Sequence, residues 1–505
     1  MAKFLSKVFW MLAVAAALGC SDSSDRRSAV VVPPPEEPQF LPIASAELSL
    51  PPDIGTSLNL GIFDLASVGF EEQEYFISGT ASAFTNLNEL GSDGFWEVEA
   101  GEQAEYTTRV LVRRPINEED FNGTVLVEWM NVSSGFDTTP EWDNAHVEIV
   151  REGYAWIGIT AQFVGVYGRE GGIVPFHLKA FNADRYEALV HPGDSFSYDI
   201  FSQLAEAIRN PQGLDLLDGL TPQYLIGSGD SQSAFRLTTY VNAVHPLYNP
   251  YDGYLIHSRA SYSSALAQDP QVLIGVPNEV FIRTDLNAPV LVFQAETDVL
   301  RGSLNSVLVR QDDSDILRYW EVAGTAHTDR YSSGAGWTDA GNDPSAGAVL
   351  ELDNIQGFIQ CDSAINSGPM HYVFNAALDA LNTWIVDGDA PPIAEPLVVT
   401  DDLSALVLDD LGLATGGIRT PYVDVPVAVL SGYGQSGESF CGLFGTTMLF
   451  SADQLVSLYG DQAAYVAAVT ASAEEAVAAG FVLPPDAQQM IDWAPQQWLF
   501  QTEGK

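Results

Sequence analysis

The middle of the chain alternates between short apolar runs and amphipathic stretches. Apolar runs of strand length occur at residues 124–129, 154–160, 223–227, 254–257, 290–293 and 319–322. The amphipathic stretches, which repeat apolar positions at helical spacing, include residues 145–152, 197–209 and 231–241. Nearly continuous apolar strands separated by helices are typical of a parallel sheet that is covered on both faces. The pattern therefore predicts an α/β fold with a mostly parallel central sheet over residues 116–370.

The regions on either side of this core have a different texture. Residues 41–115 contain short β-like runs and predict a β-rich N-terminal extension. Residues 371–505 begin with a helix at 371–387 and continue as a mixed tail that we expect to end in the Ala-rich helix 463–479. We interpret both as additions to one domain that spans residues 41–505.

The first residues carry the features of an export signal. Lys3 and Lys7 precede an apolar run, residues 8–18, that is too short to span a bilayer. The run ends at Cys20, which resembles the lipidated cysteine of bacterial lipoproteins. We expect a signal peptide at 1–19, a lipid anchor on Cys20 and a disordered, proline-rich tether at 20–40. An exported lipoprotein, in the outer membrane, the periplasm or at the cell surface, is favoured over a plain cleaved signal.

The charge balance excludes several classes of partner. The 505 residues include 67 Asp and Glu against 21 Lys and Arg, a formal net charge of −46. Such a surface repels phosphate backbones and anionic lipid, so we expect no nucleic acid partner and no membrane contact beyond the lipid anchor. With 46% hydrophobic residues, the bulk of the chain is predicted to be globular and not disordered.

Three cysteines are present. If Cys20 carries lipid, Cys361 and Cys441 remain as a pair that can form a disulfide in an oxidising compartment, and two buried free thiols are the alternative. No pair of His or Cys residues has a metal-ligand spacing such as H-x-x-x-H or C-x-x-C. We therefore predict neither a metal nor a cofactor.

A candidate nucleophile lies between a strand and a helix. The apolar residues 224–227 lead through Gly229 and Asp230 to Ser231, and an amphipathic helix follows. A nucleophile elbow needs small residues two positions before and after the serine, because bulky side chains would clash in the tight turn. Ser233 stands where the usual pattern has Gly. Ser231 is the predicted nucleophile, and a serine that only caps the helix is the alternative.

Two further strand ends supply an acid and a base. The strand at 288–295 is followed by Glu296 and Asp298, and an acid in this position orients the catalytic histidine of a triad. Asp298 fits the usual offset better, with Glu296 as the alternative. Another strand ends in small residues before His327. His327 completes the order Ser, acid, His, whereas His257, which also ends a strand, lies before the acid.

The tetrahedral intermediate of acyl transfer needs two backbone N–H donors. We expect one from Gln232, directly after the nucleophile, and the other from Asn131 or Val132 in the loop after the first apolar strand. Segments 162–191 and 261–286 are either a lid over an apolar acyl site or buried packing.

Several motifs together resemble a bacterial family known as "alpha/beta hydrolase domain" proteins. They are EWMN at 128–131, GDSQSA at 229–234, ETD at 296–298, EVAGTAH at 321–327 and GIRTP at 417–421. The resemblance runs from about residue 45 to the C-terminus. It implies the α/β-hydrolase fold and esterase chemistry, and it implies little about the substrate.

The sequence thus predicts a serine hydrolase that cleaves a small-molecule carboxylic ester through an acyl-enzyme. Two alternatives remain. A triad does not distinguish ester from amide, so a serine peptidase of the same fold is one. A surface-anchored binding protein that keeps the fold without turnover is the other.

Overall fold

The computed structural model describes residues 40–58, 63–170, 176–300, 302, 304–355, 359–437 and 440–504. The predicted signal peptide, Cys20 and the tether up to residue 39 lie outside these ranges, so they stay predictions. From Phe40 onwards the chain packs as one compact unit. None of the helices in the described ranges is both long and apolar enough to traverse a bilayer.

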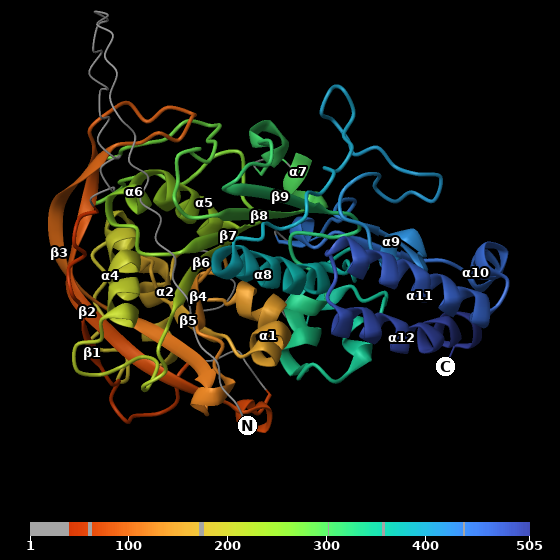
Figure 1. Ribbon diagram of the computed structural model, residues 1–505, viewed down its shortest axis with the longest axis horizontal. Helices are drawn as coiled ribbons and strands as arrows, with labels where there is room; N and C mark the ends of the chain where they lie inside the picture. Colours follow the sequence, from red (N-terminus) through yellow and green to blue (C-terminus); the bar gives the residue numbers. More distant parts are fainter. Residues whose placement is uncertain are drawn as a thin grey trace, which may run out of the picture. The chain divides into compact units, whose positions relative to one another are not determined.

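One large sheet organises the described residues, with the strand order β1-β2-β3-β5-β4-β6-β7-β8-β9 (Figure 1). Its strands are β1 (Glu47–Ser49), β2 (Phe70–Asn86), β3 (Val98–Pro115), β4 (Thr124–Trp129), β5 (Ala155–Ile159), β6 (Tyr224–Asp230), β7 (Gly253–His257), β8 (Val290–Ala295) and β9 (Leu317–Val322). In sheet order, the six strands β5, β4, β6, β7, β8 and β9 pair in parallel, whereas β1, β2 and β3 pair antiparallel. The predicted α/β fold with a mostly parallel sheet and N-terminal strands is confirmed.

The N-terminal extension is continuous with this sheet. Strands β2 and β3 have 17 and 18 residues, which makes them much longer than the apolar runs that suggested them. They form a hairpin whose second strand pairs antiparallel with β5, for example Val110 with Ile159. The extension therefore widens the core sheet and does not form a separate layer.

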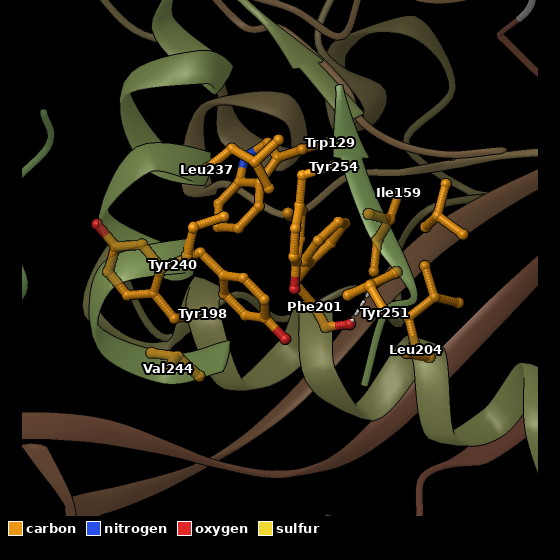
Figure 2. Packing of buried hydrophobic residues seen from close by; sticks show 14 of the residues in the cluster. Trp129, Ile159, Tyr198, Phe201, Leu204, Leu237, Tyr240, Val244, Tyr251 and Tyr254 are labelled. Carbon is orange, nitrogen blue, oxygen red and sulfur yellow. Dashed lines mark hydrogen bonds between the residues drawn. The ribbon is translucent and has the colours of Figure 1, made fainter. Parts of the chain in front are cut away.

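Helices cover both faces of the sheet because consecutive strand residues point to opposite sides. Val125 and Val127 join the core beneath α4 (Ser197–Arg209) and α5 (Gln232–Thr239), while Leu126 joins the core beneath α1 (Pro140–Glu152) and α8 (Met370–Asp387). Figure 2 shows the first of these cores, where aromatic rings from strands and helices interlock. The rings of Phe201 and Tyr251 stack there with centroids 4.7 Å apart.

Short elements fill the connections. They are α2 (Phe163–Tyr167), α3 (Leu178–Phe181), α6 (His245–Tyr248), α7 (Glu296–Leu300), β10 (Asn354–Ile355) and β11 (Ile359–Gln360). The C-terminal part contains α9 (Pro421–Asp424), β12 (Ala428–Ser431), β13 (Thr446–Leu449), α10 (Ala452–Tyr459), α11 (Gln462–Ala479) and α12 (Pro484–Glu503).

The prediction that the Ala-rich helix ends the tail is wrong, because α12 follows it and packs against it (Figure 1). Three prolines obscure α12 in the sequence. Pro484 and Pro485 occupy its first turn, where a missing N–H costs no helical hydrogen bond. Pro495 lies inside the helix, a position that ordinarily argues against one.

Candidate active site

Ser231 lies in a sharp turn between β6 and α5. Its backbone has φ 54° and ψ −118°, a conformation that residues with a side chain rarely adopt. Its N–H donates to the carbonyl of His257 on the neighbouring strand over 2.9 Å. The strained turn therefore holds the serine at the carboxyl end of the parallel strands, as a nucleophile elbow requires.

The packing around Ser231 explains why the residues two positions before and after it, Gly229 and Ser233, must be small. A Cβ atom on Gly229 would lie 3.1 Å from the Cβ of Ser233, which is closer than most side chains tolerate. Ser233 is buried, and its hydroxyl donates to the carbonyl of Met130 over 3.3 Å. The serine that replaces the usual glycine thus links the nucleophile helix to the loop after β4.

His327 follows β9 and reaches back to Ser231. Its Nε2 lies 2.8 Å from the Oγ of Ser231, and its Nδ1 lies 2.6 Å from the Oδ1 of Asp298. Gly324, with φ +75°, makes the turn between the strand and the histidine. The three predicted triad residues are therefore joined by a continuous chain of hydrogen-bond distances.

The carboxylate of Asp298 is buried and fixed by two further donors. Its Oδ2 accepts from the Ser258 hydroxyl over 2.8 Å and from the N–H of Ala295 over 2.7 Å. These bonds leave Oδ1 directed at His327. A carboxylate in this position favours the tautomer in which Nε2 is free to accept the proton of the serine.

Glu296, the alternative acid, lies elsewhere. Its carboxylate accepts from the N–H groups of Gly324 and Gly432 over 2.6 and 2.8 Å. Burial raises the pKa of this carboxyl to about 7, although the two N–H donors act against the shift. Asp298 and not Glu296 therefore contacts His327, and Glu296 instead holds together two backbone turns.

For the single oxyanion donor expected in the loop after β4, Asn131 and Val132 were the two candidates. The N–H of Asn131 already donates to the carbonyl of Thr138 over 3.0 Å, so the prediction of this N–H as an oxyanion donor is wrong. Val132 stays a prediction. Gln232 is the first residue of α5, where the helix itself provides no acceptor for an N–H. The N–H of Gln232 therefore has no acceptor within the helix, and its role as an oxyanion donor stays a prediction.

Two residues near the triad were missed in the sequence. Ser258 binds Asp298 as described, and the Oγ1 of Thr297 accepts from the N–H of His327 over 3.2 Å. Ser258 directly follows β7, at the carboxyl end of the strand next to the one that carries the acid. That placement is the signal that could have revealed it, whereas the role of Thr297 depends on how the His327 loop folds back.

A second group of ionisable side chains lies beneath the elbow. The Nδ1 of His257 lies 3.3 Å from the Oε2 of Glu141 and 3.6 Å from the Oδ1 of Asp230. Burial lowers the pKa of His257 and raises that of Asp230 to about 6. Burial also raises the pKa of Glu141 well above its ordinary value. Burial therefore shifts the pKa of each of the three groups in the direction that favours its uncharged form.

The segments considered as lids are anchored to the nucleophile helix. Asp194 accepts from the N–H of Phe163 over 2.8 Å and from the guanidinium of Arg236, on α5, over 3.0 Å. Arg236 also donates to the side chain of Gln268, in the second segment, over 2.9 Å. One residue of each segment therefore contacts the same buried ion pair, Asp194 with Arg236.

Cys361 and Cys441 form the predicted disulfide, with Cα atoms 5.4 Å apart. Across the described ranges, no three His, Cys, Asp or Glu side chains converge as ligands for a metal ion. A cavity of about 350 Å³ lies at the opposite end of the sheet from the triad, beside Tyr224, Asp252 and Pro289 at the starts of β6, β7 and β8.

The strand order and the strained serine at the end of β6, followed by an acid after β8 and a histidine after β9, define the α/β-hydrolase class. A model of the "Alpha/beta hydrolase domain" family matches residues 30–492, and the chain belongs to this family. No curated protein matches the sequence significantly.

Solved structures with some likeness to the chain include three hydrolases. A putative dienelactone hydrolase from Klebsiella pneumoniae subsp. pneumoniae MGH 78578 is 14% identical, with 52% of this chain and 95% of the other covered and a TM-score of 0.26. A thermostable esterase from Pseudomonas putida ECU1011 is 14% identical, with 52% and 75% covered and a TM-score of 0.28. The carboxylesterase Cest-2923 from Lactobacillus plantarum WCFS1 is 12% identical, with 45% and 74% covered and a TM-score of 0.26.

Proposed function

We propose that the protein hydrolyses carboxylic esters through an acyl-enzyme on Ser231. The observation that carries the proposal is the distance of 2.8 Å between Ser231 Oγ and His327 Nε2, combined with the contact of His327 Nδ1 to the buried Asp298. A serine hydroxyl is a weak nucleophile until an adjacent base accepts its proton. In the proposed mechanism His327 is that base, and Asp298 orients it.

The proposed reaction has two halves. Ser231 Oγ attacks the ester carbonyl while His327 Nε2 takes the proton, and the N–H of Gln232 stabilises the oxyanion with a second donor from the Val132 region. His327 then protonates the departing alcohol, and the acyl group remains on Ser231. A water molecule, deprotonated by His327, attacks the acyl-enzyme. His327 then returns this proton to Ser231 Oγ as the bond to the acyl group breaks and the carboxylic acid leaves.

The proposal is tested by hydrolysis of p-nitrophenyl acetate and butyrate. We expect turnover by the unmodified protein, loss of turnover in Ser231→Ala, and full turnover in Ser404→Ala, whose serine is exposed at a bend of the C-terminal part. A fluorophosphonate should label the unmodified protein on Ser231. Cleavage of peptide anilides without ester turnover would favour the peptidase. The absence of both turnover and fluorophosphonate labelling would favour the binding protein.

We further propose that the protein is exported and anchored by lipid on Cys20, on the evidence of the apolar run and the small residues that precede this cysteine. Metabolic labelling with palmitate in a bacterial host should mark the unmodified protein and not the Cys20→Ser variant. Equal labelling of both would contradict the anchor.

A further inference from the structure

The segment Cys441–Gly445 lies against the loop that carries His327. The carbonyl of Leu443 accepts from the N–H of Thr328 over 3.2 Å, directly after His327. On the other side of the histidine, a Cβ atom on Gly445 would lie 2.7 Å from the Cβ of Ala326. Residues more than one hundred positions later in the chain therefore contact both neighbours of the proposed base.

The segment is held at both ends. The disulfide to Cys361 fixes its first residue, and both half-cystines are buried. Towards its other end, the carbonyl of Phe444 accepts from the N–H of Asn366 over 2.9 Å. The side-chain amide of Asn366 in turn donates to the carbonyl of Gly324, in the turn before His327, over 3.1 Å. The segment and the His327 loop are thus one connected unit.

The side chain of Leu443 belongs to an apolar cluster beside the nucleophile. The buried members of this cluster are Phe235, Ala260 and Leu304. Leu443 and Tyr262 pack against them and are only partly buried. Phe235 lies one helical turn after Ser231, whose carbonyl accepts from its N–H over 3.0 Å. The rings of Phe235 and Tyr262 lie 5.0 Å apart. The cluster therefore spans the space between the nucleophile helix and the His327 loop.

The position of this cluster decides which part of an ester can contact it. The leaving oxygen must come within hydrogen-bond reach of His327 Nε2 to receive its proton. The carbonyl oxygen must instead point to the oxyanion donors at Gln232 and in the loop after β4. A group attached to the leaving oxygen consequently extends over the His327 side, where Leu443 lies.

We propose that Leu443, held in place by the Cys361–Cys441 disulfide, forms with Phe235 and Tyr262 the wall that contacts the alcohol portion of the ester and selects apolar alcohols. This inference rests on the proposed esterase function. Removal of apolar contact area from a binding wall reduces discrimination between longer and shorter alkyl groups. The acyl side, which the wall does not contact, should be unaffected.

The experiment compares two substrate series with the full protein. Release of acid from ethyl, butyl and hexyl acetate varies the alcohol, and p-nitrophenyl acetate and butyrate vary the acyl group. In Leu443→Ala we expect the hexyl-to-ethyl ratio of kcat/KM to fall roughly 10-fold, while the butyrate-to-acetate ratio stays unchanged. Met448→Ala, whose side chain is 59% exposed on β13, is the matched control and should change neither ratio.

A second measurement leaves the sequence intact. Reduction of the disulfide by a phosphine should lower the hexyl-to-ethyl ratio in the unmodified protein, because the segment loses its fixed end. An unchanged ratio after complete reduction would overturn the role of the disulfide.

The possible failures are distinguishable by fluorophosphonate labelling. Normal labelling of Leu443→Ala with an unchanged hexyl-to-ethyl ratio, or with a change only in the acyl series, would overturn the alcohol-side wall alone. No labelling and no turnover in the unmodified protein would overturn the proposed function and this inference with it.

Discussion

The side-chain amide of Asn131 donates to the backbone carbonyl of Asp230 over 2.9 Å. This bond joins the loop after β4 to the residue that immediately precedes the nucleophile. The Oδ1 of Asn131 also accepts from the N–H of Ser133 over 2.7 Å, which shapes the same loop. We therefore expect Asn131 to position the proposed oxyanion donors through its side chain and not through its own N–H.

Loss of this side chain should slow the chemical step. We expect Asn131→Ala to reduce kcat about 10- to 100-fold with little change in KM, because a displaced oxyanion loop weakens stabilisation of the transition state more than binding of the substrate. Steady-state kinetics on p-nitrophenyl acetate measure the effect. Asn210→Ala, at an exposed helix end, is the control. An unchanged kcat in Asn131→Ala would contradict the positioning role.

Steric crowding at the elbow should make position 229 intolerant of even one methyl group. Gly229→Ala places a Cβ against Ser233, and we expect about 1–3 kcal/mol of destabilisation together with a large loss of kcat. Gly275→Ala is the matched control, since no atom lies within 4 Å of its added Cβ. Chemical denaturation and ester turnover are the measurements. Equal behaviour of the two variants would be incompatible with a crowded elbow.

The two carboxylates after β8 should respond differently to amide substitution. Asp298→Asn removes the acceptor for the His327 Nδ1–H, and we expect kcat to fall about 10³- to 10⁴-fold. Glu296→Gln leaves the triad in place and should retain most of the activity. The reverse ranking of the two variants in a turnover assay would make Glu296 the acid.

Glu296 should also leave a signature in the pH dependence of stability. Its folded-state pKa of about 7 lies above the ordinary value of 4.5, so the folded state keeps a proton that the unfolded state loses between pH 4.5 and 7. The free energy of unfolding therefore falls as the pH rises through this window, by up to ~3 kcal/mol from this group. Below pH 4.5 the Glu296 carboxyl is protonated in both the folded and the unfolded state, so it no longer changes the free energy of unfolding.

The Glu296→Gln variant isolates this contribution. Urea unfolding at pH 4.5 and at pH 7.5 should show a smaller decline for the variant than for the unmodified protein, since glutamine does not titrate. Identical declines would mean that Glu296 has an ordinary pKa in the folded state.

Removing one partner of the buried ion pair between Asp194 and Arg236 should lower the free energy of unfolding far more than removing one partner of an exposed pair. Both side chains are at most 9% exposed, so Asp194→Ala leaves a buried guanidinium without its partner, and we expect a loss of about 3–5 kcal/mol. Asp285→Ala removes the partner of Arg283 at a half-exposed site and should reduce stability by less than about 1 kcal/mol. Guanidinium denaturation compares them. Similar losses would refute the anchoring of the two segments through Arg236.

Local sequence patterns were sufficient for the parts of this protein that depend on neighbouring residues. Ser231 could be found because the elbow needs a strand, small flanking residues and a helix within a few positions. His327 followed from its order in the chain, and the helix 197–209 matched α4 because its apolar periodicity is uninterrupted. In α12 the prolines hid the same signal.

Only the tertiary structure decided the relationships between distant segments. In the folded protein the carboxylate of Asp298 contacts His327, and that of Glu296 accepts hydrogen bonds from two glycine N–H groups, although both carboxylates follow the same strand. It directed the N–H of Asn131 to Thr138 and brought Leu443 against the residue after His327. The sequence determined which residues can do chemistry, because elbows, strands and helices are short-range patterns. Which of them meet depends on how loops fold back over the sheet, and backbone hydrogen bonds of that kind leave no mark on the residue types involved.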